Sequence, residues 1–533
     1  MIYQRSFRVL ILLILGLVFF SFRDFGITWD EPNQNRYGKY VVQYYQTFFL
    51  DESALSYLDA YLYGALFDAL ASLLVHLSPI GEFETRHLLN ALVGVIGIVG
   101  IGKVTTLLAG ARAGLLAALL LFLEPSYFGH MFNNPKDIPF AVGYIWSLYF
   151  LLKSLPYFPA LPVHLMVALG GAIGLTLGVR IGGLVLLAYL LLVVALYCIY
   201  PACFTPRPGL HTRPHRWYKA LLKSLLAVFL VAYIAMLICW PWAQKNPLVR
   251  PFEALDYMSQ FRIQDGGLLA RVLLGGEYLN AKDLPATYQA HYFAVKMPEL
   301  ILLGLGLAVV MATFFLWRGK AKVHKLQTAR YALLAFAVVF PLVYVVVKKS
   351  VFYDSMRHFL FIVPCLCCFS AIALEKLLEK LAGKRPWRRI AVGAFVAVLL
   401  LPQIYTLWRL HPHQYVYYNH LAGGLQGASG RYEMDYWGNS YKEAVALLLE
   451  YLQGQEDLRL EEQIYWVWAV GPEESAAYYF PPYLRPTQKP QDADFAICFT
   501  RWGLDENIPG PTIAKVERLG VKLSVVKDLR KLN

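Results

Sequence analysis

Long apolar runs separated by short polar links dominate the hydrophobic pattern of this sequence. A run of about 20 apolar residues is the length that an α-helix needs to cross the hydrocarbon core of a bilayer. Runs close to this length lie near residues 8–22, 86–108, 112–126, 138–156, 162–179, 181–200, 217–240, 298–317, 330–347, 357–376 and 388–408. The pattern therefore predicts a mainly α-helical integral membrane protein with about eleven transmembrane helices.

The polar links fall into two classes, one on each side of the predicted membrane. Short links rich in Lys and Arg all fall on the side of the amino terminus, near 103–112, 153, 207–219, 318–330 and 384–389. The longer stretches fall on the other side, at 23–85, 127–137, 241–297 and from 409 onward. By the positive-inside rule, the amino terminus is cytoplasmic and the longer stretches are extracytoplasmic.

The composition agrees with a membrane protein. Of the 533 residues, 58% are hydrophobic and only 16% are charged, which is too apolar for a soluble protein of this size. The net charge of +13 comes from the basic links. It therefore reflects membrane topology, and we expect membrane lipids and no nucleic acid as partners.

Two domains are expected, a transmembrane domain at 1–408 and an extracytoplasmic α/β domain at 409–533. The second domain has a helical pattern at 440–452 and β-rich runs near 463–470, 494–499 and 520–526. Within 23–85, two aromatic-rich segments with helical periodicity, 33–50 and 54–77, predict helices that lie at the membrane interface.

Asp30 and Glu31 follow the first apolar run, where charge is expensive unless it has a partner or a function. A carboxylate here suits a general base for a hydroxyl or an amine, or a metal ligand. The alternative is structural, because Pro32 favours the first turn of a helix and acids are stabilised there.

A second polar segment, 124–139, returns to the same side of the membrane. It brings His130, Asn134, Lys136 and Asp137 towards Asp30, so the two acidic loops are expected to converge on one pocket. The alternative for Asp137 is that it caps the helix that follows.

Cations on the same side complete a candidate site. Arg180 lies between two very apolar runs, and Arg357 and His358 begin another. Isolated arginines in such surroundings need a counter-charge, and a phosphate is a suitable one. Lys349 is a further candidate, although lysines at this position also extend to lipid headgroups.

Several motifs in series resemble the polytopic GT-C glycosyltransferases, in particular the family-39-like group of protein O-mannosyltransferases and the aminoarabinose transferase. The motifs are TWDEP (28–32), FNNPKDIPF (132–140), GVRIGG (178–183), DLPATYQAHYFAVKMPE (283–299), YDSMRHFLFIVP (353–364) and YYNHLAGGLQGASGRYEMDYWGNSYKEA (417–444). The resemblance implies a GT-C fold and inverting transfer of a sugar from a polyprenyl-phosphate donor to a lipid, polysaccharide or protein acceptor.

The resemblance also implies roles for individual residues. The catalytic candidates would be Asp30, Glu31 and Asp137. Asp30 would be the catalytic residue, with Glu31 beside it, and Asp137, the acid of the second loop, would support the acceptor or orient the site. Arg180, Arg357, Lys349 and His358 would bind the donor phosphate. The acceptor or the shape of the site would involve His130, Asn134, Lys136, Tyr288 and His291.

Other features of this class stay open at the level of sequence. No cofactor is required by the residues, but a divalent cation at Asp30 and Asp137 is possible in such enzymes. The segment Asp435–Ser440 suits either a junction at the membrane surface or an acceptor site, and Asn439 or Ser440 would cap the helix at 440–452. A bacterial cytoplasmic membrane is the expected location.

A transporter or flippase of polyprenyl-linked glycans or other anionic solutes is the rival hypothesis. Such proteins also place arginines and acids in spanning regions, but typically near the bilayer midplane and in inverted repeats. Here the charged residues lie at the ends of the predicted spans.

Overall fold

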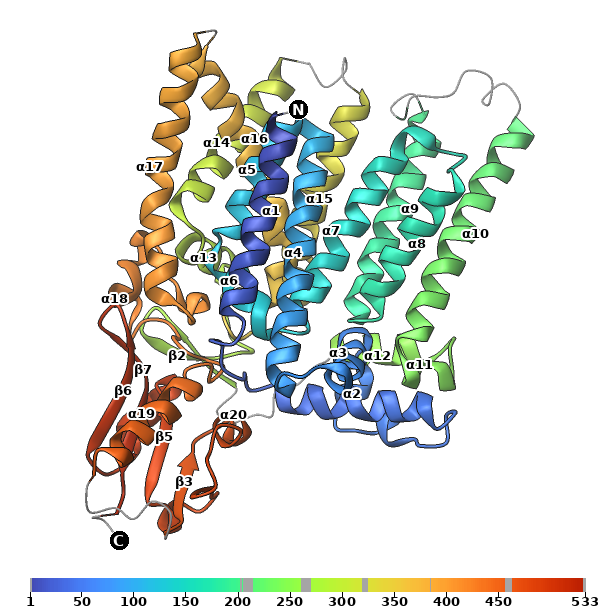
Figure 1. The fold of residues 1–533 in the computed structure, drawn as a ribbon. Helices are drawn as coiled ribbons and strands as arrows, with labels where there is room; N and C mark the ends of the chain where they lie inside the picture. Colours follow the sequence, from blue (N-terminus) through green and yellow to red (C-terminus); the bar gives the residue numbers. More distant parts are fainter. Residues whose placement is uncertain are drawn as a thin grey trace.

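The computed structural model describes residues 2–201, 204, 214–259, 270–318, 325–383, 385–455 and 463–530. A bundle of long helices forms one part of the molecule, and a small sheet domain lies at one end of it, beyond the end of the bundle opposite to the amino terminus (Figure 1). We refer to this end of the bundle as the tail side. Parts of the basic links, 205–213, 319–324 and 384, lie outside the described residues.

Nine helices among the described residues are long and apolar enough to cross a membrane, which makes this a multi-pass membrane protein. Three of them continue from or into a 3-10 turn, η3 (Leu155–Tyr157), η4 (Ile181–Gly183) or η8 (Arg357–Ile362). The nine are α1 (Ile2–Ser21), α4 (Glu82–Ala109), α7 (Asp137–Ser154), α9 (Leu184–Ile199), α10 (Pro214–Ile238), α14 (Glu299–Trp317), α15 (Lys325–Lys348), α16 (Val363–Ala382) and α17 (Pro386–Leu410).

Two further predicted runs form helices of a different kind. The run predicted at 112–126 is a bent pair, α5 (Ala111–Phe122) and α6 (Pro125–Asn133), with an angle of 66° between the two helices. The break has a local cause, because Glu124 accepts hydrogen bonds from the backbone N–H groups of Ser126 and Tyr127 and so starts a new helix. The run predicted at 162–179 is α8 (Val163–Leu177), which has only 15 residues.

The centre of the bundle is formed by α4, α7 and α16, which are mostly buried, whereas α1, α14 and α17 are mostly exposed along their apolar faces. Such exposed apolar faces suit contact with lipid. Glycines allow close packing at the centre, since a side chain on Gly97 would collide with the hydroxyl of Tyr127 and one on Gly143 with Thr176.

The stretch 23–85 contains two helices that lie across the tail side of the bundle, α2 (Glu31–Gln46) and α3 (Leu66–Leu77). The helix predicted at 54–77 is correct only from Leu66 onward. Before it the chain makes two 3-10 turns, η1 (Ser53–Leu55) and η2 (Ala60–Leu62). Asp68 on α3 is buried against Arg86, with 2.6 Å between Oδ1 and Nη2.

The stretch 241–297 contains a β-hairpin that the hydrophobic pattern did not predict. Its strands β1 (Arg271–Leu274) and β2 (Glu277–Asn280) are antiparallel and are joined by Gly275 and Gly276, both with positive φ. A Gly-Gly pair between two short apolar segments is a hairpin signal that was available in the sequence. Three helices flank the hairpin, α11 (Pro241–Lys245), α12 (Arg250–Ser259) and α13 (Tyr288–Lys296).

The C-terminal domain is a mixed five-stranded sheet. Its strands lie in the order β4 (Leu484–Pro486), β3 (Tyr465–Ala469), β5 (Phe495–Phe499), β7 (Val521–Asp528) and β6 (Thr512–Arg518). The β3 strand is parallel to β4 and β5, and β7 is antiparallel to its two neighbours. The predicted strands correspond to β3, β5 and β7, while β4 and β6 were missed.

Helix α19 (Tyr441–Gln453) packs on β5, β6 and β7 and confirms the helix predicted at 440–452. Ser440 occupies the N-cap position, as predicted, but its side chain makes no capping hydrogen bond. Shorter helices complete this part of the chain, namely η9 (Gln414–Val416), η10 (His420–Ala422), α18 (Gly424–Ala428), α20 (Glu473–Ala477), η11 (Pro490–Asp492), η12 (Arg501–Gly503) and α21 (Leu504–Asn507).

Glu443 on α19 forms ion pairs with two residues outside this helix, Arg518 and His413. Its Oε2 lies 2.6 Å from Nη2 of Arg518 on β6 and 3.2 Å from Nε2 of His413. Burial alone would raise the pKa of Glu443, but the hydrogen bonds from His413 and Arg518 lower it to about 2.

We predict that Glu443→Gln lowers the Tm of the protein at pH 7. A carboxylate whose pKa is lowered by folding contributes stability above its ordinary pKa, and this contribution is lost as the pH falls towards about 2. The Tm difference between the variant and the wild type should therefore shrink below about pH 4.5. Thermal unfolding in detergent at several pH values measures it, and a difference that does not vary with pH would contradict the assignment.

Candidate functional site

A pocket of about 700 Å³ opens beside the start of α2. Its apolar part is lined by α9 and α15, with Leu184, Val185, Ala188, Phe340, Tyr344 and Val345. Its polar part collects side chains from separate stretches of the chain, namely Asp30, Asn33, Gln34, Asp59, Lys136, Arg180, Arg357 and His358. The apolar part of the pocket therefore ends at a cluster of charged side chains.

Asp30 presents its carboxylate to this pocket. It occupies the N-cap position of α2 but makes no side-chain capping bond. Its side chain is 45% exposed, and Oδ2 lies 3.3 Å from Nη1 of Arg357. Asp30 is therefore accessible to a ligand and held by a cation, which a purely structural acid at a helix start would not require.

Glu31 lies next to Asp30 in the sequence but outside the pocket lining. Its buried carboxylate accepts a hydrogen bond of 2.8 Å from the backbone N–H of Thr28 and lies 3.2 Å from Nε2 of His87. Glu31 is the first residue of α2, and its carboxylate reaches back over the preceding turn, where the hydroxyl of Thr28 also donates to it at 3.1 Å. Glu31 therefore fixes the turn that presents Asp30.

Asp137 is buried at the first residue of α7, where it is held by two arginines. Its Oδ1 lies 2.6 Å from Nη1 of Arg180, and its Oδ2 lies 3.9 Å from Nε of Arg357. The side-chain amide of Asn134 also donates to Oδ2, at 2.8 Å. The two acidic loops therefore converge, as predicted, with Arg357 between their carboxylates.

The cations differ in how fully they are paired. Arg180 is 22% exposed at its side chain, and its Nε–H has no hydrogen-bond partner in the described structure. The Nε–H of Arg357 is likewise without one. Lys136 lies over the ring of Tyr63, with Nζ 4.0 Å from the ring centre. Both of these Nε atoms are buried, and Arg180 presents more of its side chain to the polar end of the pocket than Arg357 does.

Other predicted site residues lie outside the pocket lining. Lys349 is exposed in the turn after α15. His130 is buried, with Nε2 2.9 Å from the hydroxyl of Tyr436, and its Nδ1 faces Asn134 at 3.3 Å. His130 and Asn134 therefore support the loop that carries Asp137 and do not face the pocket.

Tyr288 and His291 lie on α13, also outside the pocket lining. The hydroxyl of Tyr288 accepts a bond of 3.2 Å from the N–H of Ser355, and Nε2 of His291 lies 2.8 Å from the hydroxyl of Tyr432. Burial raises the pKa of Tyr288 well above its usual value and lowers that of His291. Both side chains therefore join α13 to neighbouring segments.

Sequence analysis missed several residues near the charges. Tyr63 places its ring against Lys136 and Arg180, and Trp437 places its ring under Arg357, 4.4 Å from the guanidinium carbon. Asp354 pairs with Arg357 at 3.1 Å. Asp354 and Trp437 both lie inside the motifs given above, so their position was a usable signal, whereas Tyr63 was only one of several aromatic residues in the segment 54–77.

The charges at this site do not suit a metal ion. Within the described ranges, no group of three or more His, Cys, Asp and Glu side chains could hold one. Between the carboxylates of Asp30 and Asp137, where a divalent cation would be coordinated, lies the guanidinium of Arg357.

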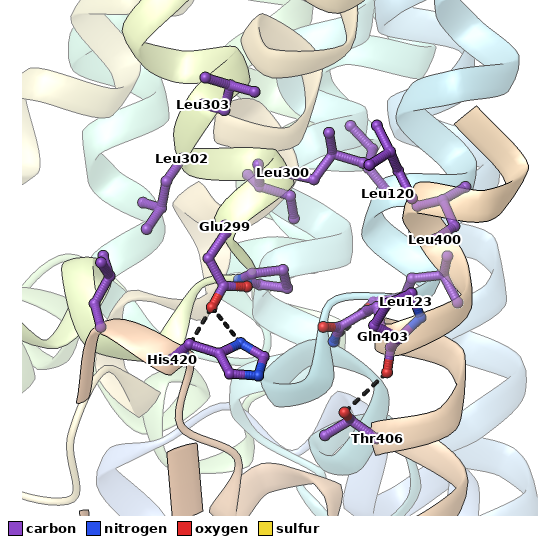
Figure 2. A pocket seen from close by; sticks show the side chains of 15 residues that line it. Leu120, Leu123, Glu299, Leu300, Leu302, Leu303, Leu400, Gln403, Thr406 and His420 are labelled. Carbon is purple, nitrogen blue, oxygen red and sulfur yellow. Dashed lines mark hydrogen bonds and ion pairs between the residues drawn. The ribbon is translucent and has the colours of Figure 1, made fainter. Parts of the chain in front are cut away.

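A second cavity, of about 570 Å³, lies between α14, α17 and α5 (Figure 2). Its walls are mostly leucines, and none of its lining residues is a Lys or an Arg. At its polar end Glu299 accepts hydrogen bonds from His420, 2.7 Å from the backbone N–H and 2.9 Å from Nδ1. A carboxylate without a nearby cation repels phosphate, so the first pocket is the better anion site.

No family model matches the sequence, and no curated protein does. Among solved structures, the chain is similar to ArnT from Cupriavidus metallidurans bound to undecaprenyl phosphate, with 16% identity, a TM-score of 0.48 and 98% of each chain covered. It is also similar to the oligosaccharyltransferase of Archaeoglobus fulgidus in the apo form, with 15% identity, a TM-score of 0.47 and coverage of 92% of this chain and 69% of that one.

A third similar structure is the same archaeal enzyme, AglB, in complex with an inhibitory peptide and a dolichol-phosphate, with 16% identity and a TM-score of 0.47. It covers 92% of this chain and 65% of that one.

We predict that Arg180→Ala lowers stability by about 2 kcal/mol, because it leaves Asp137 buried without its nearest cation. Asp137→Asn in the same background should recover part of that loss, since the unpaired charge is then removed. Thermal unfolding of the wild type, both single variants and the double variant gives the coupling energy. Additive effects of the two substitutions would mean that the pair makes no net contribution.

Proposed function

We propose that this protein is an inverting glycosyltransferase that moves a sugar from a polyprenyl-phosphate donor to an acceptor. The observation that supports this most strongly is the pocket in which Asp30 lies beside Arg180 and Arg357 at the end of an apolar channel. The apolar wall suits the lipid chain, the arginines suit the phosphate, and the carboxylate of Asp30 suits an acceptor that must lose a proton.

The apolar part of the pocket suits the polyprenyl chain. The side chains from α9 and α15 that line it are aliphatic and aromatic, and both helices are among those long enough to cross a membrane. A lipid chain can therefore enter this channel from the bilayer with its phosphate towards the charged end.

The polar part suits the phosphate. Arg180, Arg357 and Lys136 all line this end of the pocket, and the side chain of Arg180 is 22% exposed. Guanidinium groups bind phosphate oxygens through paired hydrogen bonds. Asp137 would act as a positioning residue, because its ion pairs with both arginines fix where their remaining donors point.

The proposed reaction is a single displacement at the anomeric carbon. The acceptor oxygen or nitrogen attacks this carbon from the face opposite the phosphate, and the bond from carbon to phosphate oxygen breaks. The polyprenyl phosphate leaves with the bonding electron pair, and its charge is stabilised by Arg180 and Arg357. Asp30 takes the proton from the acceptor as general base. One displacement inverts the anomeric configuration.

The proposal places the reaction on the extracytoplasmic side of a bacterial cytoplasmic membrane. The pocket lies beside the start of α2, on the tail side of the bundle, whereas described basic residues of the links lie at helix ends, Arg112 at the start of α5, Lys153 at the end of α7 and Arg318 directly after α14. These helix ends lie at the other end of the bundle (Figure 1). Because basic residues concentrate on the cytoplasmic side, the tail side is extracytoplasmic in this proposal.

We predict that Asp30→Asn reduces turnover by at least about 100-fold, the usual scale for loss of a general base. The amide has nearly the same shape but cannot take up the proton, so binding of the donor should persist. Labelled polyprenyl-phosphate sugars incubated with purified protein, with release of polyprenyl phosphate as readout, measure this. Asp24→Asn is the matched control, because Asp24 pairs with His411 away from the pocket.

A fully active Asp30→Asn variant would remove Asp30 from the mechanism. The wild type could instead move the donor across liposome membranes without releasing polyprenyl phosphate. That result would favour a transporter or flippase.

We also predict that Arg180→Ala weakens binding of undecaprenyl phosphate by about 10-fold, since one charge-assisted contact to the phosphate is lost. Isothermal titration in detergent at a temperature where both proteins are folded measures the Kd. Arg112→Ala is a suitable control, because Arg112 forms its ion pair with Glu375 at the opposite end of the bundle. An unchanged Kd for Arg180→Ala would contradict its role in binding phosphate.

A further inference from the structure

A buried arginine joins the C-terminal domain to the charged pocket. Arg501, which follows strand β5, is 2% exposed at its side chain, and its Nη2 lies 2.6 Å from Oδ1 of Asp354. Its Nη1 donates to the backbone carbonyl of Tyr436 at 2.8 Å. An arginine of the sheet domain therefore forms an ion pair with Asp354, three residues before Arg357.

Asp354 divides its carboxylate between two arginines. Oδ1 pairs with Arg501 at 2.6 Å, and Oδ2 pairs with Nη2 of Arg357 at 3.1 Å. Asp354 and Arg357 are both buried, so these contacts are protected from solvent. In such surroundings the geometry of one pair constrains the other, because the carboxylate cannot turn towards Arg357 without losing Arg501.

A second contact from the segment after the last spanning helix positions the Arg357 guanidinium, on the face that packs against Trp437. The ring of Trp437 lies under it at 4.4 Å, a distance at which a cation and an aromatic face attract. Trp437 is held in a loop organised by Asp435, whose carboxylate accepts the backbone N–H groups of Trp437, Gly438 and Ser440.

The same loop holds the chain that leads to Asp30. The backbone carbonyl of Trp437 accepts the N–H of Trp29 at 2.9 Å, and Oδ1 of Asn439 accepts the N–H of Gly26 at 2.7 Å. The ring of Trp29 packs against Phe499 and Trp502, on either side of Arg501 in the sequence. Residues after the last spanning helix thus fix both Asp30 and Arg357.

We propose that Arg501 is a positioning residue of the donor-phosphate site, which acts through Asp354 to set the direction of the Arg357 guanidinium. This inference rests on the proposed function, since it assigns Arg357 to the donor phosphate. Without Arg501, both oxygens of Asp354 are free to pair with Arg357 and draw its donors away from the pocket. The C-terminal domain is then a part of the active site and not a separate appendage.

Binding of undecaprenyl phosphate to the full-length protein tests this inference without turnover. We expect Arg501→Ala to raise the Kd by about 10-fold, measured by titration in detergent at a temperature where the variant is folded. Arg518→Ala is the matched control, because Arg518 is also an arginine of the sheet domain with a carboxylate partner, Glu443, but is remote from Asp354. It should lower the Tm and leave the Kd unchanged.

The conservative variant and the kinetics separate positioning from stability. Arg501→Lys keeps the charge beside Asp354 and should recover part of the lost affinity. In the sugar-transfer assay, Arg501→Ala should raise the KM for the donor more than it lowers kcat. Equal Kd values for wild type and Arg501→Ala would overturn the inference, as would an equal rise for Arg518→Ala. If the wild type itself does not bind undecaprenyl phosphate, the proposed function fails instead.

Discussion

Arg357 has three carboxylates around it, and the arrangement of the pocket depends on how its donors are divided among them. Asp30 lies 3.3 Å away, Asp354 3.1 Å and Asp137 3.9 Å. These acids come from the loop before α2, the segment before η8 and the start of α7, so one guanidinium joins three parts of the chain. Burying such charges is favourable only when they are paired with good geometry, which makes the site a rigid unit. The helices α4, α7 and α16 supply the packed centre that holds it.

Much of this architecture was predictable because the membrane imposes strong rules on a sequence. All eleven predicted apolar runs contain a helix, since a chain in lipid must satisfy its backbone internally. The convergence of the loops with Asp30 and Asp137 followed from counting spans, because alternate loops must lie on the same side. The ends of helices were less predictable. The bend between α5 and α6 depends on Glu124, and the start of α3 depends on two 3-10 turns that the hydrophobic periodicity does not indicate.

The pairing of side chains was beyond prediction from one sequence. Asp354 and Arg501 are 147 positions apart, and neither periodicity nor composition links them. The different orientations of Asp30 and Glu31 were equally hidden, because adjacent residues at a helix start diverge according to which one closes the turn. The hydrogen bond from the N–H of Thr28 decides this in favour of Glu31 and leaves Asp30 to face Arg357 in the pocket. Local hydrogen bonding thus determines which of the two acids faces the pocket.

The shortness of α8 bears on where Arg180 lies relative to the membrane. Its 15 residues rise roughly 22 Å at about 1.5 Å each, less than the hydrocarbon core of about 30 Å. Arg180 follows only three residues after its end. A hydrophobic stretch shorter than the bilayer is accommodated by local thinning or by flanking residues that extend to the headgroups, at a modest energetic cost for each Å of mismatch. Arg180 is such a flanking residue, so the same side chain that binds Asp137 also lies where a short span meets the polar boundary of the membrane.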